Sequence, residues 1–188
     1  MNDIIESYLK GREEGYFNVR LGYDVLYMDP QARAFFGKGF KVGEKLRKQE
    51  ENNETEAKHI MYNQMRNAYI TIVGYKSTYE YYIADESLLK NEEDIKAFEE
   101  GCRIGLEYKS GTINELNSDD ADLYAIISGY NNAIENNLDC TFIVKEENMA
   151  SYQRGYNVGK VCKDIKTDAM NELNEIQINS FKNKSKKK

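Results

Sequence analysis

Apolar residues recur every three or four positions along much of the chain, which is the spacing that places them on one face of an α-helix. The pattern begins with Ile4, Ile5, Tyr8, Leu9, Tyr16, Val19, Tyr23, Leu26 and Tyr27 and continues with Phe35, Phe36, Phe40 and Leu46. Residues 17–27 also alternate apolar and polar positions, as a β-strand would. The neighbouring segments have the helical spacing, so we interpret this part as helix and predict an all-α fold.

Glycines mark a repeated pattern within these segments. Six windows contain an aromatic or apolar residue, a glycine three positions later, and a small residue four positions after that. The windows are Tyr8/Gly11/Gly15, Phe36/Gly39/Gly43, Thr71/Gly74/Thr78, Phe98/Gly101/Gly105, Ile126/Gly129/Ala133 and Tyr152/Gly155/Gly159, of which the one that begins at Thr71 fits least well. Ten of the 13 glycines occupy positions of this pattern, and successive leading glycines are 26 to 35 residues apart. Self-similarity of this period is typical of helical repeat proteins.

The second, fourth and sixth windows share the pattern aromatic-x-x-Gly-x-x-(Val or Ile)-Gly, which indicates three tandem units of two helices. We predict six main helices arranged as three αα-hairpins, in units of about 1–52, 53–117 and 118–181, that form a short solenoid or a closed bundle. Residues 1–181 are expected to form one domain and residues 182–188 a disordered lysine-rich tail. The expected helix starts, each at a residue that caps helices well, are Asp29-Pro30, Asn53 or Thr55, Asn91, Ser118 or Asp119, and Asn148.

The glycines need a compensating role, because glycine inside a helix lowers its stability by about 1 kcal/mol relative to alanine. A glycine and a small residue four positions later lie on one helix face and form a notch that a backbone or an aromatic side chain can enter. We expect the notches to serve packing, with the aromatic residues as their fillers. A second interpretation, in which the notches line a ligand cavity, stays open. Its candidate residues are Gly39, Gly101 and Gly155, with Arg103 and Arg154 as nearby groups that neutralise phosphate.

Composition and charge restrict the class of protein further. Of 188 residues, 40% are hydrophobic and 31% charged, which is a soluble globular composition. No apolar stretch of about 18 residues occurs, and the N-terminus lacks the features of a secretory signal, so we expect a cytoplasmic protein without a membrane segment. Removing the five lysines of the last seven residues takes the formal net charge from −6 to −11. The acidic body favours a partner with a basic surface, and the tail is suited to weak contact with nucleic acid.

The sequence contains no motif for catalysis, a metal or a cofactor. His59 is the only histidine and stands without a nucleophile motif. Cys102, Cys140 and Cys162 have no C-x-x-C spacing, which disfavours zinc and disulfides. No phosphate-binding P-loop occurs, and the acidic clusters lie where they would stabilise helix starts. We therefore predict a protein that is not an enzyme and has no cofactor and no metal.

Fifteen tyrosines are the most unusual side-chain feature. The core must draw on them, because the chain has no tryptophan. Consecutive aromatic residues on a helix cannot all point inward, however, and tyrosine suits binding surfaces. The candidate partner-binding residues are therefore the cluster of Tyr75, Tyr79, Tyr81 and Tyr82.

Helical repeats usually present surfaces to partners, so the leading hypothesis is a non-enzymatic protein-binding module. The abundance of Asn, Lys and Ile is typical of AT-rich genomes, which favours a phage or mobile-element accessory protein that occludes a host or defence protein. Two alternatives stay open. One is a helical protein that sequesters a small molecule or a nucleotide, and the other is an acidic mimic of nucleic acid. Homo-oligomerisation stays open as well, because terminal repeats would expose apolar faces.

Overall fold

The computed structural model describes residues 2–21, 29–52, 54–79, 89–111, 120–135 and 144–185, with side chains placed within residues 4–172. These residues form six α-helices and one short 3-10 helix, and none of them lies in a strand, which confirms the predicted all-α fold class. The elements are α1 (Asn2–Tyr16), α2 (Pro30–Glu51), α3 (Glu56–Tyr79), α4 (Glu92–Ser110), α5 (Ala121–Glu135), η2 (Glu146–Asn148) and α6 (Met149–Ser185).

Several helices begin where the capping residues predict. The Asp29 carboxylate accepts hydrogen bonds from two backbone N–H groups of α2, at 2.8 and 3.0 Å, and Pro30 is the first helical residue. Asn91 accepts a hydrogen bond from a backbone N–H of α4 at 2.9 Å. Helix α3 begins after Thr55, and α6 begins after Asn148. Three other predicted capping residues lie outside the described part of the chain: Asn53, Ser118 and Asp119.

The first helix ends at Tyr16, so the interpretation of residues 17–21 as helix is wrong. Asn18 has a φ of 49°, the left-handed conformation in which helices commonly end. The backbone N–H of Val19 donates to the carbonyl oxygen of Glu14 at 3.0 Å, as in a Schellman motif. Beyond this point every second side chain is buried, at Phe17, Val19 and Leu21. The alternating sequence pattern therefore marks a non-helical segment with one face against the core, and residues 22–28 lie outside the described residues.

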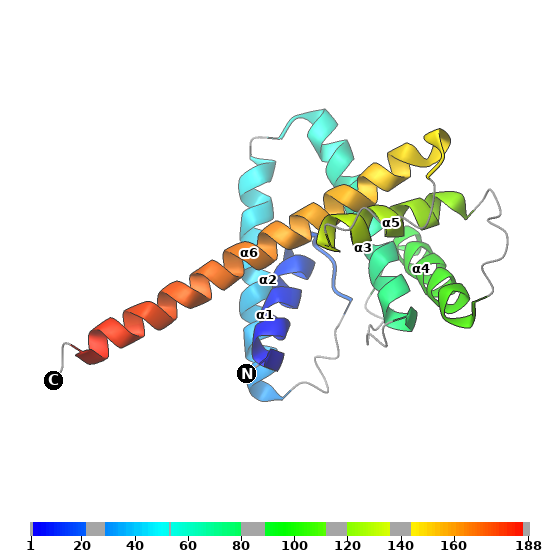
Figure 1. Cartoon of the computed structure of the whole chain (residues 1–188). Helices are drawn as coiled ribbons and strands as arrows, with labels where there is room; N and C mark the ends of the chain where they lie inside the picture. Colours follow the sequence, from blue (N-terminus) through cyan, green and yellow to red (C-terminus); the bar gives the residue numbers. More distant parts are fainter. Residues whose placement is uncertain are drawn as a thin grey trace.

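Consecutive helices pack as three pairs, α1 with α2, α3 with α4, and α5 with α6 (Figure 1). Within each pair, a Cβ atom added to the leading glycine of one window would overlap the carbonyl oxygen of the first residue of the other window. These reciprocal contacts join Gly11 to Phe36 and Gly39 to Tyr8, Gly74 to Phe98 and Gly101 to Thr71, and Gly129 to Tyr152 and Gly155 to Ile126. The six windows are therefore the points of closest approach of three helix pairs. Backbone carbonyl groups fill the notches, so the expectation of aromatic fillers is wrong.

The two helices of each pair run in the same direction. Tyr8 faces Gly39 and Arg12 faces Gly43, so residue numbers rise together along α1 and α2, and the other pairs have the same register. A hairpin is antiparallel and has a loop of about two to five residues. The three connections within pairs have 13, 12 and 13 residues, which is long enough to return along the helix. The predicted hairpin geometry is therefore wrong, while the interpretation of the pairs as tandem copies of one unit stays a prediction.

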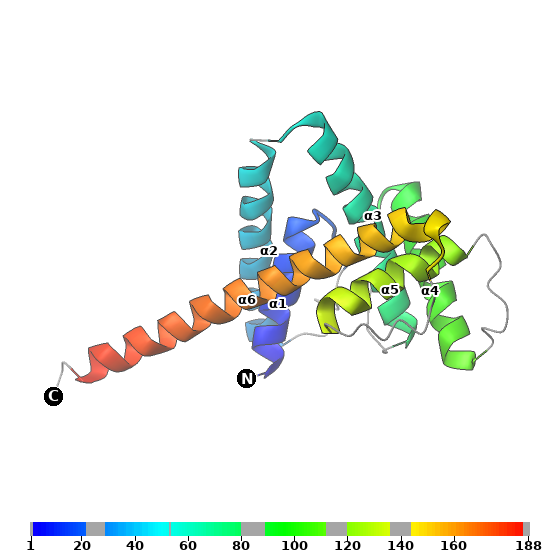
Figure 2. The same cartoon turned by 45° about the horizontal axis from the view of Figure 1, so that its top comes forward.

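Helix α6 joins the three pairs into one arrangement. It packs along α5 and also contacts α3 and α1. Figures 1 and 2 both show its C-terminal end extending beyond the other helices. The helix continues to Ser185 and so includes part of the segment predicted as a disordered tail, whereas residues 186–188 lie outside the described residues.

One main core cluster draws side chains from all three pairs, among them Phe17, Tyr69, Phe98, Ile126 and Val158. At its centre the ring of Tyr69 on α3 stacks on the ring of Phe17, with 4.3 Å between the centroids. Both side chains are at most 2% exposed. This stack fixes the position of Tyr69, which lines the cavity described next.

Candidate ligand-binding cavity

The residues proposed from the sequence as a ligand cavity do not come together. Gly39, Gly101 and Gly155 are buried in three different helix pairs, each against the backbone of its partner helix. Arg103 is exposed and holds the carboxylate of Asp120 with two hydrogen bonds, at 2.5 and 3.0 Å. Arg154 lines a separate cavity of about 470 Å³ between α3, α4, α5 and α6. A ligand that reached the glycines would have to separate the paired helices.

The candidate tyrosines differ in exposure. Tyr75 is buried, with 4% of its surface exposed, whereas Tyr79 is 44% exposed. Their rings stack with centroids 5.2 Å apart, and the ring of Tyr108 meets both of them edge to face. Tyr79 is therefore an exposed ring on a rigid aromatic base, while Tyr81 and Tyr82 lie outside the described residues.

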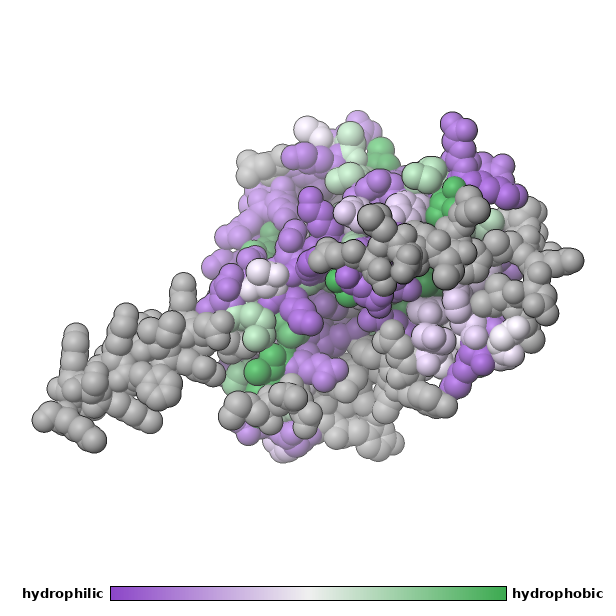
Figure 3. Space-filling view, in the orientation of Figure 1, coloured by the Kyte–Doolittle hydropathy of each residue, from purple (hydrophilic) through white to green (hydrophobic). Residues whose placement is uncertain are grey.

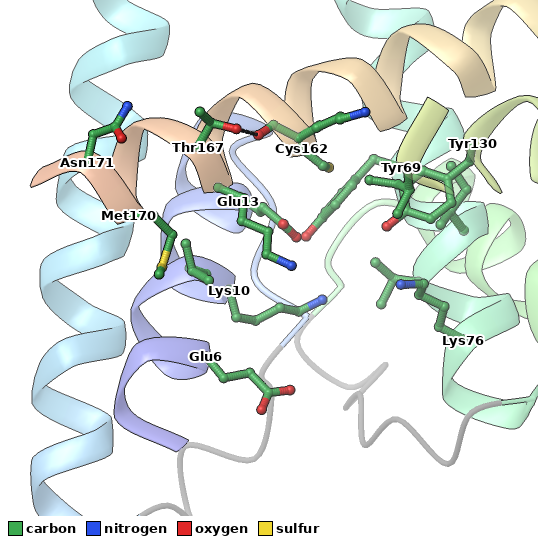
Figure 4. Close-up of a pocket in the computed structure, with 16 residues that line it drawn as sticks. Glu6, Lys10, Glu13, Tyr69, Lys76, Tyr130, Cys162, Thr167, Met170 and Asn171 are labelled. Carbon is green, nitrogen blue, oxygen red and sulfur yellow. Dashed lines mark hydrogen bonds between the residues drawn. The ribbon is translucent and has the colours of Figure 1, made fainter. Parts of the chain in front are cut away.

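A second cavity, of about 630 Å³, lies where the three helix pairs meet (Figure 4). Helix α1 contributes one wall, α3 another, and α5 and α6 the rest of the lining. Its lining is Glu6, Leu9, Lys10, Glu13, Tyr69, Ile72, Val73, Lys76, Tyr130, Ile134, Cys162, Lys163, Lys166, Thr167, Met170 and Asn171. The volume falls within the range of about 300–1,000 Å³ that is usual for small-molecule sites. We call this space the junction cavity.

Helical spacing explains why these side chains face one space. On α1 the lining begins at Glu6 and ends at Glu13, at positions i, i+3, i+4 and i+7. On α3 the same spacing runs from Tyr69 to Lys76. Glu172 of α6, which follows the lining residue Asn171, accepts hydrogen bonds from Tyr8 at 3.2 Å and from Arg12 at 3.1 Å, both on α1. These bonds hold α6 against α1 and keep the two walls in place.

The junction cavity carries a charge opposite to that of the whole chain. Among the described residues, its lining contains four lysines and two glutamates, a formal charge of +2, whereas the chain has a net charge of −6. The ammonium group of Lys10 lies 5.8 Å from the ring centroid of Tyr69, and that of Lys76 lies 5.0 Å from the ring centroid of Tyr130. Figure 4 shows Lys10 and Glu13 extending from α1 toward the α3 wall. The cavity therefore concentrates positive charge between aromatic rings.

Burial shifts the pKa values of the charged groups in the cavity. Burial lowers the pKa of Lys10, the nearby Glu13 opposes that shift, and the positive charge of Lys76 adds to it. Burial raises the pKa of Glu13 despite the opposing effect of Lys10, Lys76 and Lys166. Burial also raises the pKa of the Cys162 thiol, which keeps it neutral and a poor nucleophile. A bound anion in this space would favour the charged form of the lysines.

The Tyr69 hydroxyl group is a buried polar group without a hydrogen-bond partner in the part of the chain that the structure describes. Tyr69 is only 2% exposed, and its hydroxyl oxygen has no hydrogen-bond partner among the described residues. A buried polar group without a partner costs about 1–3 kcal/mol, and such groups are rare in folded proteins. Burial raises the pKa of Tyr69 well above its usual value, so the group is a neutral hydrogen-bond donor. The hydroxyl oxygen is itself buried, so an acceptor in the cavity reaches it only when neighbouring side chains move.

Other sites have no comparable arrangement in the part of the chain that the structure describes. No group of three or more His, Cys, Asp or Glu side chains there is placed to hold a metal ion. His59 is exposed and does not line the cavity; its Nδ1 atom lies 3.3 Å from Oε2 of Glu54. No described helix has the length and apolarity needed to cross a membrane. On the face shown in Figure 3, most of the described residues are hydrophilic, and a few apolar residues lie among them.

No protein-family model matches this chain, and neither a curated protein nor a solved structure matches it. The function must therefore be inferred from the geometry of the junction cavity itself.

Proposed function

We propose that this protein is a non-enzymatic binding protein that sequesters a small organic anion in the junction cavity. The observation that carries the proposal is the buried Tyr69 hydroxyl group, which lacks a hydrogen-bond partner in a cavity with an excess of lysine. An anion supplies a hydrogen-bond acceptor, which the hydroxyl group lacks, and a charge opposite to that of the lysines. The alternative of a small-molecule sequestering protein is thereby favoured over the other functions predicted from the sequence.

The ligand is expected to be organic, because much of the lining is apolar. Leu9, Ile72, Val73, Ile134 and Met170 contribute aliphatic surface between the charged groups. Burial of such surface contributes about 25 cal/mol per Å², so an apolar body adds affinity that a simple ion cannot gain. The cavity supplies donors and apolar walls, and its thiol is held neutral, which supports binding rather than nucleophilic catalysis.

Thermal unfolding with matched compounds tests this function. We expect 1-naphthoate and 1-naphthyl phosphate to raise the melting temperature, and the uncharged 1-naphthol to raise it much less. At a concentration of about 100 times the Kd, a ligand stabilises the folded state by about 2.7 kcal/mol, which is about 5–10 °C for a chain of this size.

Two lysine variants serve as a matched pair in this assay. Lys10→Gln removes a charge from the cavity, and Lys45→Gln removes one from an exposed position on α2. The first is expected to reduce the shift and the second to leave it unchanged. No shift with either anion, or an equal shift with 1-naphthol, would overturn the proposed function.

Protein binding is the second candidate, and Tyr79 is the observation that favours it. Its exposed ring is held by Tyr75 and Tyr108, and rigid exposed aromatic rings are common at the centres of protein interfaces. The predicted role of a phage accessory protein that occludes a host protein depends on such a surface. A tagged full-length chain, a truncation after Phe181 and Tyr79→Ala would be compared in a host lysate. A stoichiometric partner lost only with Tyr79→Ala would support this candidate, and retention by all three would contradict it.

A further inference from the structure

We infer that the smaller cavity, of about 470 Å³, binds a zwitterionic α-amino acid whose side chain is uncharged. We call this space, between α3, α4, α5 and α6, the Arg154 cavity. It shares no described lining residue with the junction cavity, so the inference is independent of the proposed function. Three features lead to it: a cation and an anion that face one space without an ion pair, a wall of carboxamide side chains, and aliphatic surface beside them.

Arg154 is a half-buried cation that has no carboxylate within ion-pair distance among the described residues. The other buried or half-buried arginines described, Arg12, Arg47 and Arg66, each hold a carboxylate at 3.1 Å or less. Asp122 and Arg154 attract each other electrostatically, but their charged atoms are more than 4.0 Å apart. A guanidinium group binds a carboxylate through two parallel hydrogen bonds. Arg154 is therefore available for the carboxylate of a ligand.

Asp122 supplies the negative charge of the lining on the α5 side. The side chain of Asn148 donates a hydrogen bond to this carboxylate at 3.1 Å. This bond and one from Ser151 lower the pKa of Asp122, and the charge of Arg154 adds to the effect. Asp122 is therefore ionised near neutral pH. A carboxylate has about four acceptor sites, so it can also accept hydrogen bonds from an ammonium group.

The third charged group of the lining has a partner outside the cavity. Oε1 of Glu100 on α4 lies 3.9 Å from the ammonium nitrogen of Lys96, one helical turn earlier. The separated charges that face a ligand are then those of Arg154 and Asp122. An anion or a cation alone would satisfy one of them and be repelled by the other. A zwitterion supplies a carboxylate for the first and an ammonium group for the second.

The rest of the Arg154 cavity suits a small uncharged side chain. Asn63, Gln64 and Asn67 of α3 line it, and their carboxamide groups have no hydrogen-bond partner among the described residues. Each carboxamide can both donate and accept hydrogen bonds. Leu123 and Ile126 of α5 add aliphatic surface. A carboxamide or aliphatic side chain meets this lining without the desolvation of a further charge.

Methyl NMR of the full chain at pH 7 during titration with L-glutamine tests the inference and locates the site. Ile60 and Ile126 line the Arg154 cavity, and Ile134 lines the junction cavity. We expect saturable chemical-shift changes at Ile60 and Ile126, with little change at Ile134. L-Leucine is expected to produce the same pattern, and L-glutamate, which carries a further negative charge, to bind at least about tenfold more weakly.

Two matched probes each lack one charge of the zwitterion. N-acetyl-L-glutamine has no ammonium group, and L-glutaminamide has no carboxylate. Each loss removes hydrogen bonds to a charged group, so we expect L-glutamine to bind at least about tenfold more tightly than either probe.

Two variants assign each charge to its end of the ligand. Arg154→Gln is expected to abolish the preference for L-glutamine over L-glutaminamide and to keep the preference over N-acetyl-L-glutamine. Asp122→Asn should have the reverse effect, whereas a general structural effect would weaken all probes equally. As a control, Lys160→Gln removes a positive charge from an exposed position on α6 outside the lining. It is expected to leave all affinities unchanged.

The outcomes separate this inference from the proposed function. Absence of binding by both L-glutamine and L-leucine would overturn the inference. Equal affinity of L-glutamine and either single-charge probe would overturn the recognition of a zwitterion. Shift changes confined to Ile134 would mean that the amino acid does not occupy the Arg154 cavity. None of these results bears on the binding of 1-naphthyl phosphate in the junction cavity.

Discussion

Gly37 and Gly39 lie two residues apart in α2 and differ in what surrounds them. A Cβ atom at Gly37 would have nothing within 4 Å, whereas one at Gly39 would overlap the carbonyl oxygen of Tyr8 and lie 3.0 Å from the backbone nitrogen of Arg12. Alanine at the two positions therefore changes helix propensity equally and changes packing at only one of them. We expect the two substitutions to have opposite effects on stability.

The magnitudes follow from propensity and packing. Alanine in place of a helical glycine stabilises by about 0.5–1 kcal/mol, which is the whole effect expected for Gly37→Ala. At Gly39 the helices must move apart, and overpacking of this kind costs about 1–3 kcal/mol, or more where backbone meets backbone. After the gain in propensity, we expect Gly39→Ala to lower the free energy of unfolding by about 2 kcal/mol. The two variants should then differ by about 3 kcal/mol, or about 6–12 °C in Tm.

Urea unfolding followed by circular dichroism measures this difference directly. The midpoint and the slope should both be fitted, because a change in slope would indicate altered compactness rather than altered stability alone. If Gly39→Ala is as stable as Gly37→Ala, then α1 and α2 do not approach through their backbones. The helix pairs described above would then be wrong in register or in direction.

Substitutions at three further positions test other parts of the structure. Tyr69→Phe removes a buried hydroxyl group that has no partner among the described residues. In urea unfolding without ligand, we therefore expect this variant to be more stable than the original chain by about 1 kcal/mol. A loss of stability would mean that the hydroxyl group has a partner. Asn18 has a φ of 49°, so Asn18→Gly should change Tm little and Asn18→Ala should lower it. Equal Tm values for the two variants would refute a left-handed conformation at this position. The hydrogen bond from Arg47 lowers the pKa of Glu54 in the folded state. The ionised carboxylate therefore stabilises the fold at pH values above the pKa of Glu54 in the unfolded chain. This stabilisation is lost as the pH falls through the pKa in the folded state. Glu54→Gln should therefore be less stable than the original chain at pH 7 and equally stable at strongly acidic pH, and a difference that persists in acid would contradict this.

The glycine windows located the helix contacts correctly because they reflect a local requirement. Only glycine lets a neighbouring carbonyl group approach the helix axis at Gly39 or Gly101, so the residue type and its spacing are visible in the sequence. The direction of each pair was not visible in the same pattern. Reading residues 17–27 as helix concealed a connection of 13 residues, and a connection of that length is what allows parallel packing.

The junction cavity could not be predicted from one helix at a time. The sequence does contain one signal, because Lys10 and Lys76 each lie on an apolar helical face. Lysine is rarely buried unless it is paired, so a lysine on such a face is unusual. Their convergence with Tyr69 depends on how three helix pairs meet, which local spacing does not specify. Arg154, in contrast, lies near a glycine window in the sequence and lines a different cavity.

Methyl NMR of the isoleucine side chains during titration with 1-naphthyl phosphate tests the central claim most directly. Ile72 and Ile134 line the junction cavity, Ile60 lines the smaller cavity beside Arg154, and Ile104 is fully buried elsewhere. We expect saturable chemical-shift changes at Ile72 and Ile134, with little change at Ile60 and Ile104. Changes confined to Ile60, or no saturable change at Ile72 and Ile134, would contradict the claim that the junction cavity binds an organic anion.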